Sequence, residues 1–307
     1  MAGPTASGKT KLSVDLAKQF KGEIVSADSM QIYQEMQIAT AKPSEEEKCG
    51  IKHHLMDFLP TDSTYSVAMF VEDAAKCISD ISSRGKLPFI VGGTGLYIDS
   101  LLNHIQFNEE QRDEKVSDEL WELYRSQGID ALLSMLSEID VQSFERLKVE
   151  KNPKRIIRAI EFYKTTGMTI SEQIKNSKSE PSPYKAIKIG LNFTDREKLY
   201  DRINKRVDSM LEQGLLEEAT QVLKNKLSFT SVKAIGYKEL APYILGEASF
   251  DECVEKLKRE TRRYAKRQIT WFKRDSEINW LYVDEYNSYD ELYNAAAAII
   301  NKGLMYG

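Results

Sequence analysis

Residues 1–10 read MAGPTASGKT and contain the P-loop pattern G-x-x-x-x-G-K-[ST]. Glycines in such a loop let the backbone curl so that successive N–H groups face one anion, and the following helix adds its unpaired N–H groups and positive dipole end. Lys9 can reach a terminal phosphate, and the Thr10 hydroxyl can ligate Mg²⁺. Because a helix-forming segment follows at once, we favour a phosphate site over a glycine-rich turn without a ligand. The residues expected to bind a di- or triphosphate are Gly3, Pro4, Thr5, Ala6, Ser7, Gly8, Lys9 and Thr10.

A P-loop normally follows a buried strand, but only Met1 and Ala2 precede Gly3 here. The sequence therefore predicts either that the record begins late or that the sheet lacks its central strand. In the second case the strand that supports the phosphate site would be missing, which argues against activity.

Composition restricts the class of protein. Of 307 residues, 41% are hydrophobic and 29% are charged, which is typical of a soluble globular chain. No apolar run is long enough for a membrane helix and no signal peptide is visible, so we expect a cytoplasmic monomer with no membrane partner. Three scattered cysteines without C-x-x-C spacing and only three histidines argue against disulfides, zinc and histidine-based metal sites. The net charge of −4 argues against a uniformly basic nucleic-acid protein but permits local basic faces.

Apolar spacing predicts helices and strands that alternate at both ends of the chain. Buried strands are expected over residues 23–27, 87–91, 186–193 and 278–283. Helices are expected over 9–20, from Ser66 to Gly85, over 194–213, over 251–272 and after Ser288. This alternation is typical of an α/β fold, and with the P-loop it predicts an NTPase-like parallel sheet flanked by helices.

The central part of the chain has a different character. Strand signals disappear and helical periods take over, one of them starting at Asn152 with Pro153 in its first turn. We therefore predict an all-helical insertion domain over 108–184, within an α/β core formed by 1–107 and 185–307. Local patterns further predict a capping box of Thr194 with Glu197, a helix cap at Asp251, and His53 and His54 as loop or packing residues, with metal ligation as the less favoured alternative.

Asp28 directly follows the strand predicted over 23–27. This position places a carboxylate at the carboxyl edge of the sheet, where open α/β sheets bind ligands, although a helix cap or turn residue fits it equally well. Gly92-Gly93-Thr94-Gly95 follows the strand predicted over 87–91. Such a turn is weak evidence of binding by itself, but two glycine-rich turns that end strands of one sheet should face the same crevice.

The helix predicted over 251–272 is unusually basic for an acidic protein. One interpretation is a solvated face with i,i+4 ion pairs. We favour the other, a surface that contacts RNA phosphates and has aromatic side chains for stacking. The basic residues of this helix and its end are Lys256, Lys258, Arg259, Arg262, Arg263, Lys266, Arg267, Lys273 and Arg274.

Several motifs together resemble one known family. They are G-P-T-A-S-G-K-T from Gly3, D-S-M-Q-I-Y from Asp28, T-A-K-P from Thr40, H-H-L-M-D from His53, G-G-T-G-L-Y from Gly92, A-I-G-Y-K-E from Ala234 and K-R-Q-I-T-W-F from Lys266. In this order and spacing they resemble the tRNA dimethylallyltransferase (isopentenyltransferase) family from Gly3 to about Arg274. Seven ordered motifs are far more specific than the P-loop alone.

The resemblance implies Mg²⁺-dependent transfer of a dimethylallyl group from its diphosphate to N6 of adenosine 37, beside the anticodon of tRNA. It implies that the P-loop binds the prenyl diphosphate instead of ATP. By matched position, Asp28 would accept the N6 proton, and Lys9, Thr10 and Arg206 would hold the pyrophosphate, with Thr10 as the possible Mg²⁺ ligand. The catalytic residues implied are thus Asp28, Arg206 and Thr10.

The same resemblance implies a contact surface for the tRNA anticodon stem-loop, with C-terminal helices of the core contributing to it. The matched positions are Asp28, Ser29, Met30, Gln31, Thr94, Lys154, Arg155, Arg158, Lys233, Gly236, Tyr237, Lys238, Lys266, Arg267, Gln268, Trp271 and Lys273.

Three other functions remain open from the sequence. The P-loop alone also fits a small-molecule kinase that uses ATP, but the basic helix argues against it. A catalytically inactive RNA-binding relative is favoured if the strand before the P-loop is truly absent. An adenine-nucleotide prenyltransferase would share the chemistry and differ in its acceptor.

Overall fold

The computed structural model describes residues 1–103, 113–179, 182–224, 231 and 234–305. The chain divides into two compact units. An α/β unit comprises Met1–Leu101 and Lys185–Gly307, and a helical unit comprises Leu102–Tyr184. Within the described ranges, no helix is both long enough and apolar enough to span a membrane.

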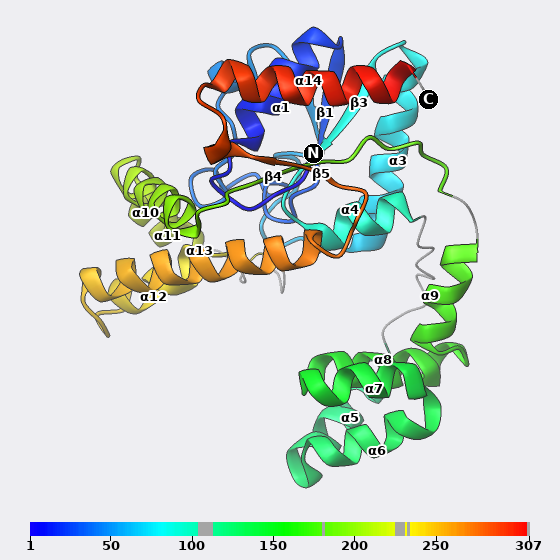
Figure 1. The fold of residues 1–307 in the computed structure, drawn as a ribbon. Coiled ribbons are helices and arrows are strands. Elements are labelled where there is room, and N and C mark those ends of the chain that lie inside the picture. Colours follow the sequence, from blue (N-terminus) through cyan, green and yellow to red (C-terminus); the bar gives the residue numbers. More distant parts are fainter. Residues whose placement is uncertain (104–112, 180–181, 225–230, 232–233, 306–307) are drawn as a thin grey trace. The chain divides into compact units, whose positions relative to one another are not determined.

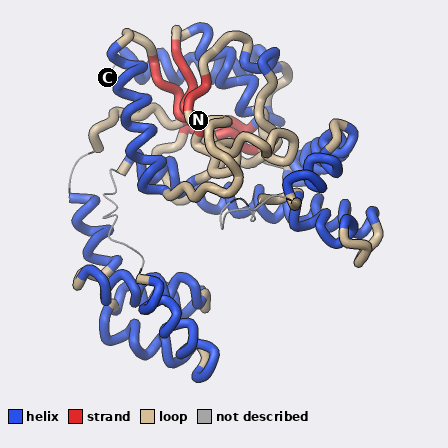
Figure 2. The backbone as a smooth tube through the Cα atoms, turned by 180° about the vertical axis from the view of Figure 1, so that it is seen from behind, coloured by secondary structure: helices blue, strands red, loops and turns tan. Residues whose placement is uncertain are grey.

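The strands described in the α/β unit all pair in parallel. Strand β1 (Gly22–Ser26) lies between β2 (His53–His54) and β3 (Leu87–Val91), while β4 (Ile189–Asn192) pairs with β5 (Asn279–Tyr282). Every residue of β1 and β4 is buried, as expected for strands covered by helices on both faces. Figure 2 shows the strands together at the centre of this unit with helices around them. The predicted α/β fold with a parallel sheet flanked by helices is confirmed.

Met1 and Ala2 connect the two groups of strands. Ala2 forms parallel bridges with Gly92 beyond β3 and with Gly190 in β4. Its N–H donates to the Ile189 carbonyl at 2.8 Å, and its carbonyl accepts from the Leu191 N–H at 2.9 Å. Among the described residues no strand precedes the P-loop, as one of the two expectations had it, but the isolated bridges of Ala2 join β3 to β4.

Helices cover both the sheet and the cavity side of the α/β unit. In Figure 1, α1 (Lys9–Gln19) and α14 (Tyr289–Met305) lie side by side, and the Tyr289 hydroxyl donates to Asp15. Helix α3 (Val67–Ser83) packs against β1 and β3, and the Ser66 hydroxyl caps it as predicted. The core between α1, the sheet and α14 includes Leu12, Leu16, Ile24, Leu191, Leu281 and Ile300. The remaining helices of the unit are α2 (Glu45–Lys48), α4 (Gly95–Leu102), α10 (Arg196–Glu212), α11 (Leu215–Val222), α12 (Tyr237–Ile244), α13 (Phe250–Phe272) and the 3-10 helix η2 (Val283–Glu285).

The helical unit has a core of its own, and its described residues form helices and turns only. Asn152 precedes α8, with Pro153 at its first position, as predicted. Its helices are α5 (Glu114–Gln127), α6 (Ile129–Ile139), α7 (Val141–Glu150), α8 (Pro153–Thr166) and α9 (Ile170–Ser179). Their apolar faces meet in a cluster that includes Leu120, Leu132, Leu136, Leu147, Ile156 and Ile160.

Three local predictions were wrong. Helix α10 is capped by Asp195 and not by Thr194, whose hydroxyl instead donates to Glu285. Helix α13 begins one residue early, because the Ser249 hydroxyl accepts the Glu252 N–H and forms a capping box. His53 and His54 form strand β2 instead of a loop.

Candidate active site

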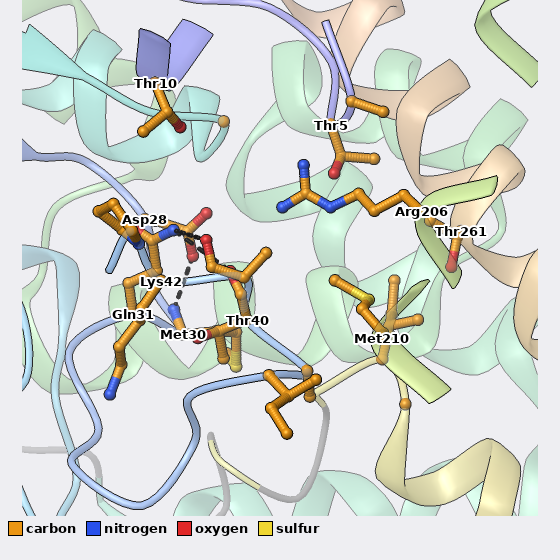
Figure 3. Close-up of a pocket in the computed structure, with 18 of the residues that line it drawn as sticks. Thr5, Thr10, Asp28, Met30, Gln31, Thr40, Lys42, Arg206, Met210 and Thr261 are labelled. Carbon is orange, nitrogen blue, oxygen red and sulfur yellow. Dashed lines mark hydrogen bonds between the residues drawn. The ribbon is translucent and has the colours of Figure 1, made fainter. Parts of the chain in front are cut away.

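A cavity of about 1300 Å³ opens at the carboxyl ends of the strands in the α/β unit. The P-loop, the segments after β1 and β3, and helices α10 and α13 supply its walls. Figure 3 shows Thr5, Thr10, Asp28, Thr40, Arg206 and Met210 around this space. Both glycine-rich turns reach it, as predicted, because the cavity contacts Gly8 on one side and Gly92 and Gly93 on the other.

The P-loop has the backbone shape that an anion cradle requires. Gly8 precedes α1 with a φ of 91°, in the left-handed region that glycine adopts readily. Arg202 of α10 supports the loop from outside, since its Nε donates to the Ala6 carbonyl at 2.9 Å. The Ser7 hydroxyl is buried and has no hydrogen-bond partner among the described residues. A buried donor without a partner fits a loop that completes its hydrogen bonds with a ligand.

Basic side chains dominate the cavity wall. Eight lysines and arginines contact the cavity against three acids, Asp28, Glu46 and Glu47. This excess of positive charge in a partly enclosed space favours an anionic ligand. The basic residues are Lys9, Lys11, Lys42, Arg202, Lys205, Arg206, Lys238 and Arg267.

Lys9, Arg206 and Asp28 form the charged centre of the site. Lys9 Nζ donates to the Pro4 carbonyl at 2.6 Å. Desolvation, together with the charge of Arg206, lowers the pKa of Lys9 to about 7 despite the opposing charge of Asp28. Desolvation also lowers the pKa of Arg206. Two cations whose charged forms are disfavoured would both be stabilised by a phosphate group placed between them.

Asp28 lies where the sequence predicted, two residues after the end of β1 and within the cavity. Its Oδ1 accepts the Met30 N–H at 2.9 Å, which fixes the carboxylate at the turn. Desolvation raises the pKa of Asp28, while the Met30 N–H, Lys9 and Arg206 oppose this shift. A fixed carboxylate with a raised pKa, open to a cavity, is suited to accept a proton from a ligand.

The second glycine-rich turn is held by a residue from α13. Gln268 is only 5% exposed and bridges the two turns, because its Oε1 accepts the Thr5 N–H at 2.9 Å and its Nε2 donates to the Gly93 carbonyl at 3.0 Å. A Cβ on Gly93 would lie 2.1 Å from that Nε2, so a larger residue would displace the bridge. Thr94 faces the Asp28 turn, and its Oγ1 accepts the Ser29 N–H at 3.0 Å.

The segment after Asp28 is tied down by two of its own polar side chains. Gln31 accepts from the Ser26 hydroxyl at 3.0 Å, and its Nε2 donates to the Thr40 carbonyl at 3.2 Å. The Lys42 side chain is 3% exposed and its Nζ contacts Asp57 at 2.5 Å. Lys42 therefore supports this cavity wall through an ion pair.

Thr10 is the residue of this loop whose hydroxyl is predicted to ligate Mg²⁺. Its residue is exposed at the cavity rim, next to Lys9. In the described part of the chain, no group of three or more His, Cys, Asp or Glu side chains could hold a metal ion.

Helix α13 has a basic outer face, as predicted. Lys266, Arg267 and Lys273 are exposed, and within the described residues none of them forms an ion pair. Two other basic residues of the helix are neutralised locally, since Lys258 contacts Asp208 at 2.7 Å and Arg263 contacts Glu260 at 2.6 Å.

Several residues matched to the tRNA surface have a different placement. Trp271 Nε1 donates to Asp99 at 2.6 Å, and Gln268 forms the buried bridge already described. Tyr237 is 1% exposed and its hydroxyl donates to Glu218. Gly236 is buried at the start of α12, whereas its neighbour Lys238 is exposed and lines the cavity. The buried Gln268 and Gly236 thus line the cavity, and Tyr237 contacts Glu218 behind its wall.

Three of the other matched residues belong to the helical unit. Lys154, Arg155 and Arg158 lie on α8 of the helical unit. There, Arg155 forms an ion pair with Glu150, and Arg158 contacts Glu161 at 3.2 Å. Lys233 lies outside the described residues.

Sequence reasoning missed some residues that build the cavity. Arg202 and Glu218 support its loops, and Met210 contributes to its apolar wall. Arg202 follows the apolar Leu199 by three positions on a basic helix, and Glu218 is one of two adjacent glutamates on a short helix. Such residues are common on helix surfaces, so only the folded structure identifies them.

The comparisons with known proteins agree with this geometry. The family model described as IPP transferase matches residues 31–275. A tRNA dimethylallyltransferase of Thermoanaerobacter sp. (strain X514) is 48% identical over 296 residues, covering 95% of this chain and 93% of that protein. One from Acetivibrio thermocellus is 48% identical over 292 residues, covering 94% and 93%.

Solved structures give the same result. The full-length tRNA isopentenylpyrophosphate transferase from Bacillus halodurans superposes with a TM-score of 0.74 at 40% identity, covering 99% of this chain and 95% of that chain. A eukaryotic dimethylallyltransferase acting on tRNA has a TM-score of 0.79 at 29% identity, covering 99% and 78%. From the match over most of its length, from the close relatives and from the P-loop cavity with Asp28, we conclude that this chain belongs to the IPP transferase family.

Proposed function

We propose that this protein transfers a dimethylallyl group from dimethylallyl diphosphate to N6 of adenosine 37 in the tRNA anticodon loop. The observation that carries the proposal is that Lys9, Arg206 and the P-loop line the same cavity as Asp28. An apolar wall completes it, formed by residues that include Ile38, Ala39, Val207, Met210 and Leu215. A cationic end and an apolar end in one space suit a prenyl diphosphate.

The chemistry follows from this arrangement. The P-loop N–H groups, Lys9 and Arg206 hold the diphosphate and stabilise the negative charge that gathers on it as the allylic C–O bond breaks. The N6 amine attacks the allylic carbon and forms the new C–N bond, and Asp28 takes the proton that N6 releases. Mg²⁺, when held by Thr10 and the diphosphate, supplies further charge neutralisation of the leaving group. The target adenine has to leave its stack to reach this edge of the sheet.

Partners and location belong to the same proposal. The exposed Lys266, Arg267 and Lys273 of the α13 end support a contact with tRNA phosphates. We further propose that the protein acts as a monomer and that it works in the cytoplasm, where tRNA is its substrate.

The direct test is transfer of label from dimethylallyl diphosphate to an anticodon stem-loop that contains A36 and A37. We expect N6-modified adenosine and free pyrophosphate, and no product from a stem-loop with G at position 37. Failure to label RNA would refute the proposal. Formation of ADP from ATP with a small acceptor would instead identify a kinase, and preference for AMP over RNA would identify an adenine-nucleotide prenyltransferase.

Asp28→Asn tests the role of the proposed base. We expect turnover to fall by about 10²–10⁴-fold, the usual contribution of a positioned general base, while tRNA affinity changes little. Asp62→Asn is the matched control, because Asp62 is exposed and does not line the cavity. Unchanged turnover in Asp28→Asn would show that another group accepts the proton.

A further inference from the structure

Glu218 of α11 makes four hydrogen bonds from one carboxylate. Its Oε2 accepts the N–H groups of Gln37 at 2.9 Å and Ile38 at 2.7 Å. Its Oε1 accepts the Ala39 N–H at 2.9 Å and the Tyr237 hydroxyl at 2.8 Å. Three consecutive main-chain donors of a loop thus converge on one charged side chain 179 or more positions away in the sequence. We call Glu218 together with the Tyr237 hydroxyl the Glu218 clamp.

The loop held by this clamp is a wall of the cavity. Gln37, Ile38 and Ala39 all line it, together with Thr40 and Ala41. The other side of the loop is held by Gln31, whose Nε2 donates to the Thr40 and Ala41 carbonyls at 3.2 and 3.4 Å. Figure 3 shows Thr40, Asp28 and Met210 among the residues that line this cavity. The segment that follows the proposed base is therefore fixed from two directions.

The clamp also brings the loop against the helices that carry it. A Cβ at Gly236, the residue before Tyr237, would lie 3.2 Å from the Cβ of Ala39. At Gly214, before α11, it would lie 3.9 Å from Cδ1 of Ile38. Ile38 and Ala39 are thus seated between the start of α11 and the start of α12, and their position depends on the hydrogen bonds that pull their backbone toward Glu218.

We propose that Glu218 is a positioning residue for the prenyl donor. Its carboxylate fixes the backbone of residues 37–39, and through Ile38 and Ala39 it sets the apolar wall that receives the hydrocarbon end of the donor. It acts on the diphosphate end only weakly, because Lys9 and the P-loop are held by other contacts. The identity of the donor rests on the proposed function. The hydrogen bonds that Glu218 makes to the loop are independent of that function.

The test compares the whole protein with Glu218→Gln, Tyr237→Phe and Glu217→Gln. In Glu218→Gln an amide NH₂ replaces one oxygen and meets a main-chain N–H, so at least one loop donor loses its acceptor. We expect the KM for dimethylallyl diphosphate to rise about tenfold, as for the loss of a hydrogen bond to a charged group, with a smaller change in kcat. The dissociation constant of inorganic pyrophosphate should stay within about twofold of the wild-type value.

Tyr237→Phe removes one of the four hydrogen bonds and should raise the same KM by about threefold. The matched control is Glu217→Gln, an exposed neighbour on α11, which should change neither constant. Amide hydrogen exchange gives a readout that needs no activity: residues 37–39 should exchange faster in Glu218→Gln and not in Glu217→Gln.

An unchanged KM in Glu218→Gln, or an equal loss of donor and pyrophosphate affinity, would overturn the positioning role. Unaltered exchange of residues 37–39 would overturn the clamp itself. If the wild-type protein transfers no prenyl group, the proposed function fails. Hydrogen exchange of residues 37–39 and the dissociation constant of pyrophosphate still test whether Glu218 fixes the loop.

Discussion

At the scale of single residues, the surroundings of Lys9 favour the binding of an anion. Its ammonium group lies in a desolvated cavity beside Arg206 and donates a hydrogen bond to the Pro4 carbonyl of its own loop. Arg206 disfavours the charged form of Lys9, and the Asp28 carboxylate offsets this effect in part. Binding of a diphosphate supplies further negative charge and should restore the protonated form of Lys9.

This restoration predicts proton uptake on binding. In the free protein the pKa of Lys9 is lowered to about 7 from an ordinary 10.5, so above pH 7 the side chain is mostly neutral. A bound anion raises that pKa, so pyrophosphate binding should take up roughly half a proton at about pH 7 and close to one proton between about pH 8 and 9.5. The affinity should then fall by up to about tenfold per pH unit from this group. Calorimetry in buffers of different ionisation enthalpy measures the uptake.

Lys9→Arg is the control for the ionisation of pyrophosphate itself. The guanidinium stays protonated throughout this range, so the variant should lose the component of the pH slope that belongs to Lys9. Equal slopes in the two proteins would mean that Lys9 is already charged in the free site.

The residues of this site differ in how well the sequence predicts them. Asp28 and the P-loop could be placed from local order alone, since each adjoins a recognisable strand or helix. Glu218 and Arg202 could not, because their partners are backbone atoms 179 to 196 positions away. No local pattern encodes a contact of that kind.

At the scale of elements, the two faces of α13 have different roles. The motif K-R-Q-I-T-W-F from Lys266 reads as one basic and aromatic block in the sequence. The helical period divides it, so that Gln268 and Phe272 point inward while Lys266 and Arg267 point to solvent. Matching by position assigns the whole block to the tRNA surface, whereas the structure places Gln268 between the two glycine-rich turns.

Gln268→Ala should therefore affect the binding of pyrophosphate, and Lys266→Ala the binding of tRNA. The first leaves the Thr5 N–H and the Gly93 carbonyl without their partner and should weaken pyrophosphate binding by about fivefold to tenfold, with an unchanged salt dependence of tRNA binding. The second should reduce the slope of log K against log salt by about one and leave pyrophosphate binding unaltered. Filter binding at several salt concentrations and calorimetry separate the two. A reduced salt slope in Gln268→Ala would place that residue on the phosphate backbone after all.

At the scale of the whole molecule, the sheet is completed by long-range pairs. At the position of the strand that normally precedes a P-loop, Ala2 forms isolated bridges with Gly92 and Gly190, partners that no local pattern identifies. Strand β2 has only two residues, His53 and His54, and forms because β1 offers a free edge. The His54 ring nitrogen Nε2 lies 2.7 Å from Oε2 of the buried Glu23 on β1. Short strands of this kind fall below what apolar periodicity can detect.

The two units have separate cores, and this separation predicts where a destabilising mutation will act. Leu132 is fully buried in the cluster of α5, α6, α7 and α8, and every other member of that cluster belongs to the helical unit. Leu132→Ala should therefore destabilise the helical unit by about 2–5 kcal/mol, the usual cost of such a cavity. Thermal unfolding should gain an earlier transition, while the affinity for pyrophosphate, whose site lies wholly in the α/β unit, should stay at the wild-type value. Leu16→Ala, in the core beside the P-loop helix, is the matched opposite and should lower both the main transition and pyrophosphate binding. A single transition that shifts as a whole in Leu132→Ala would show that the two cores unfold as one cooperative unit.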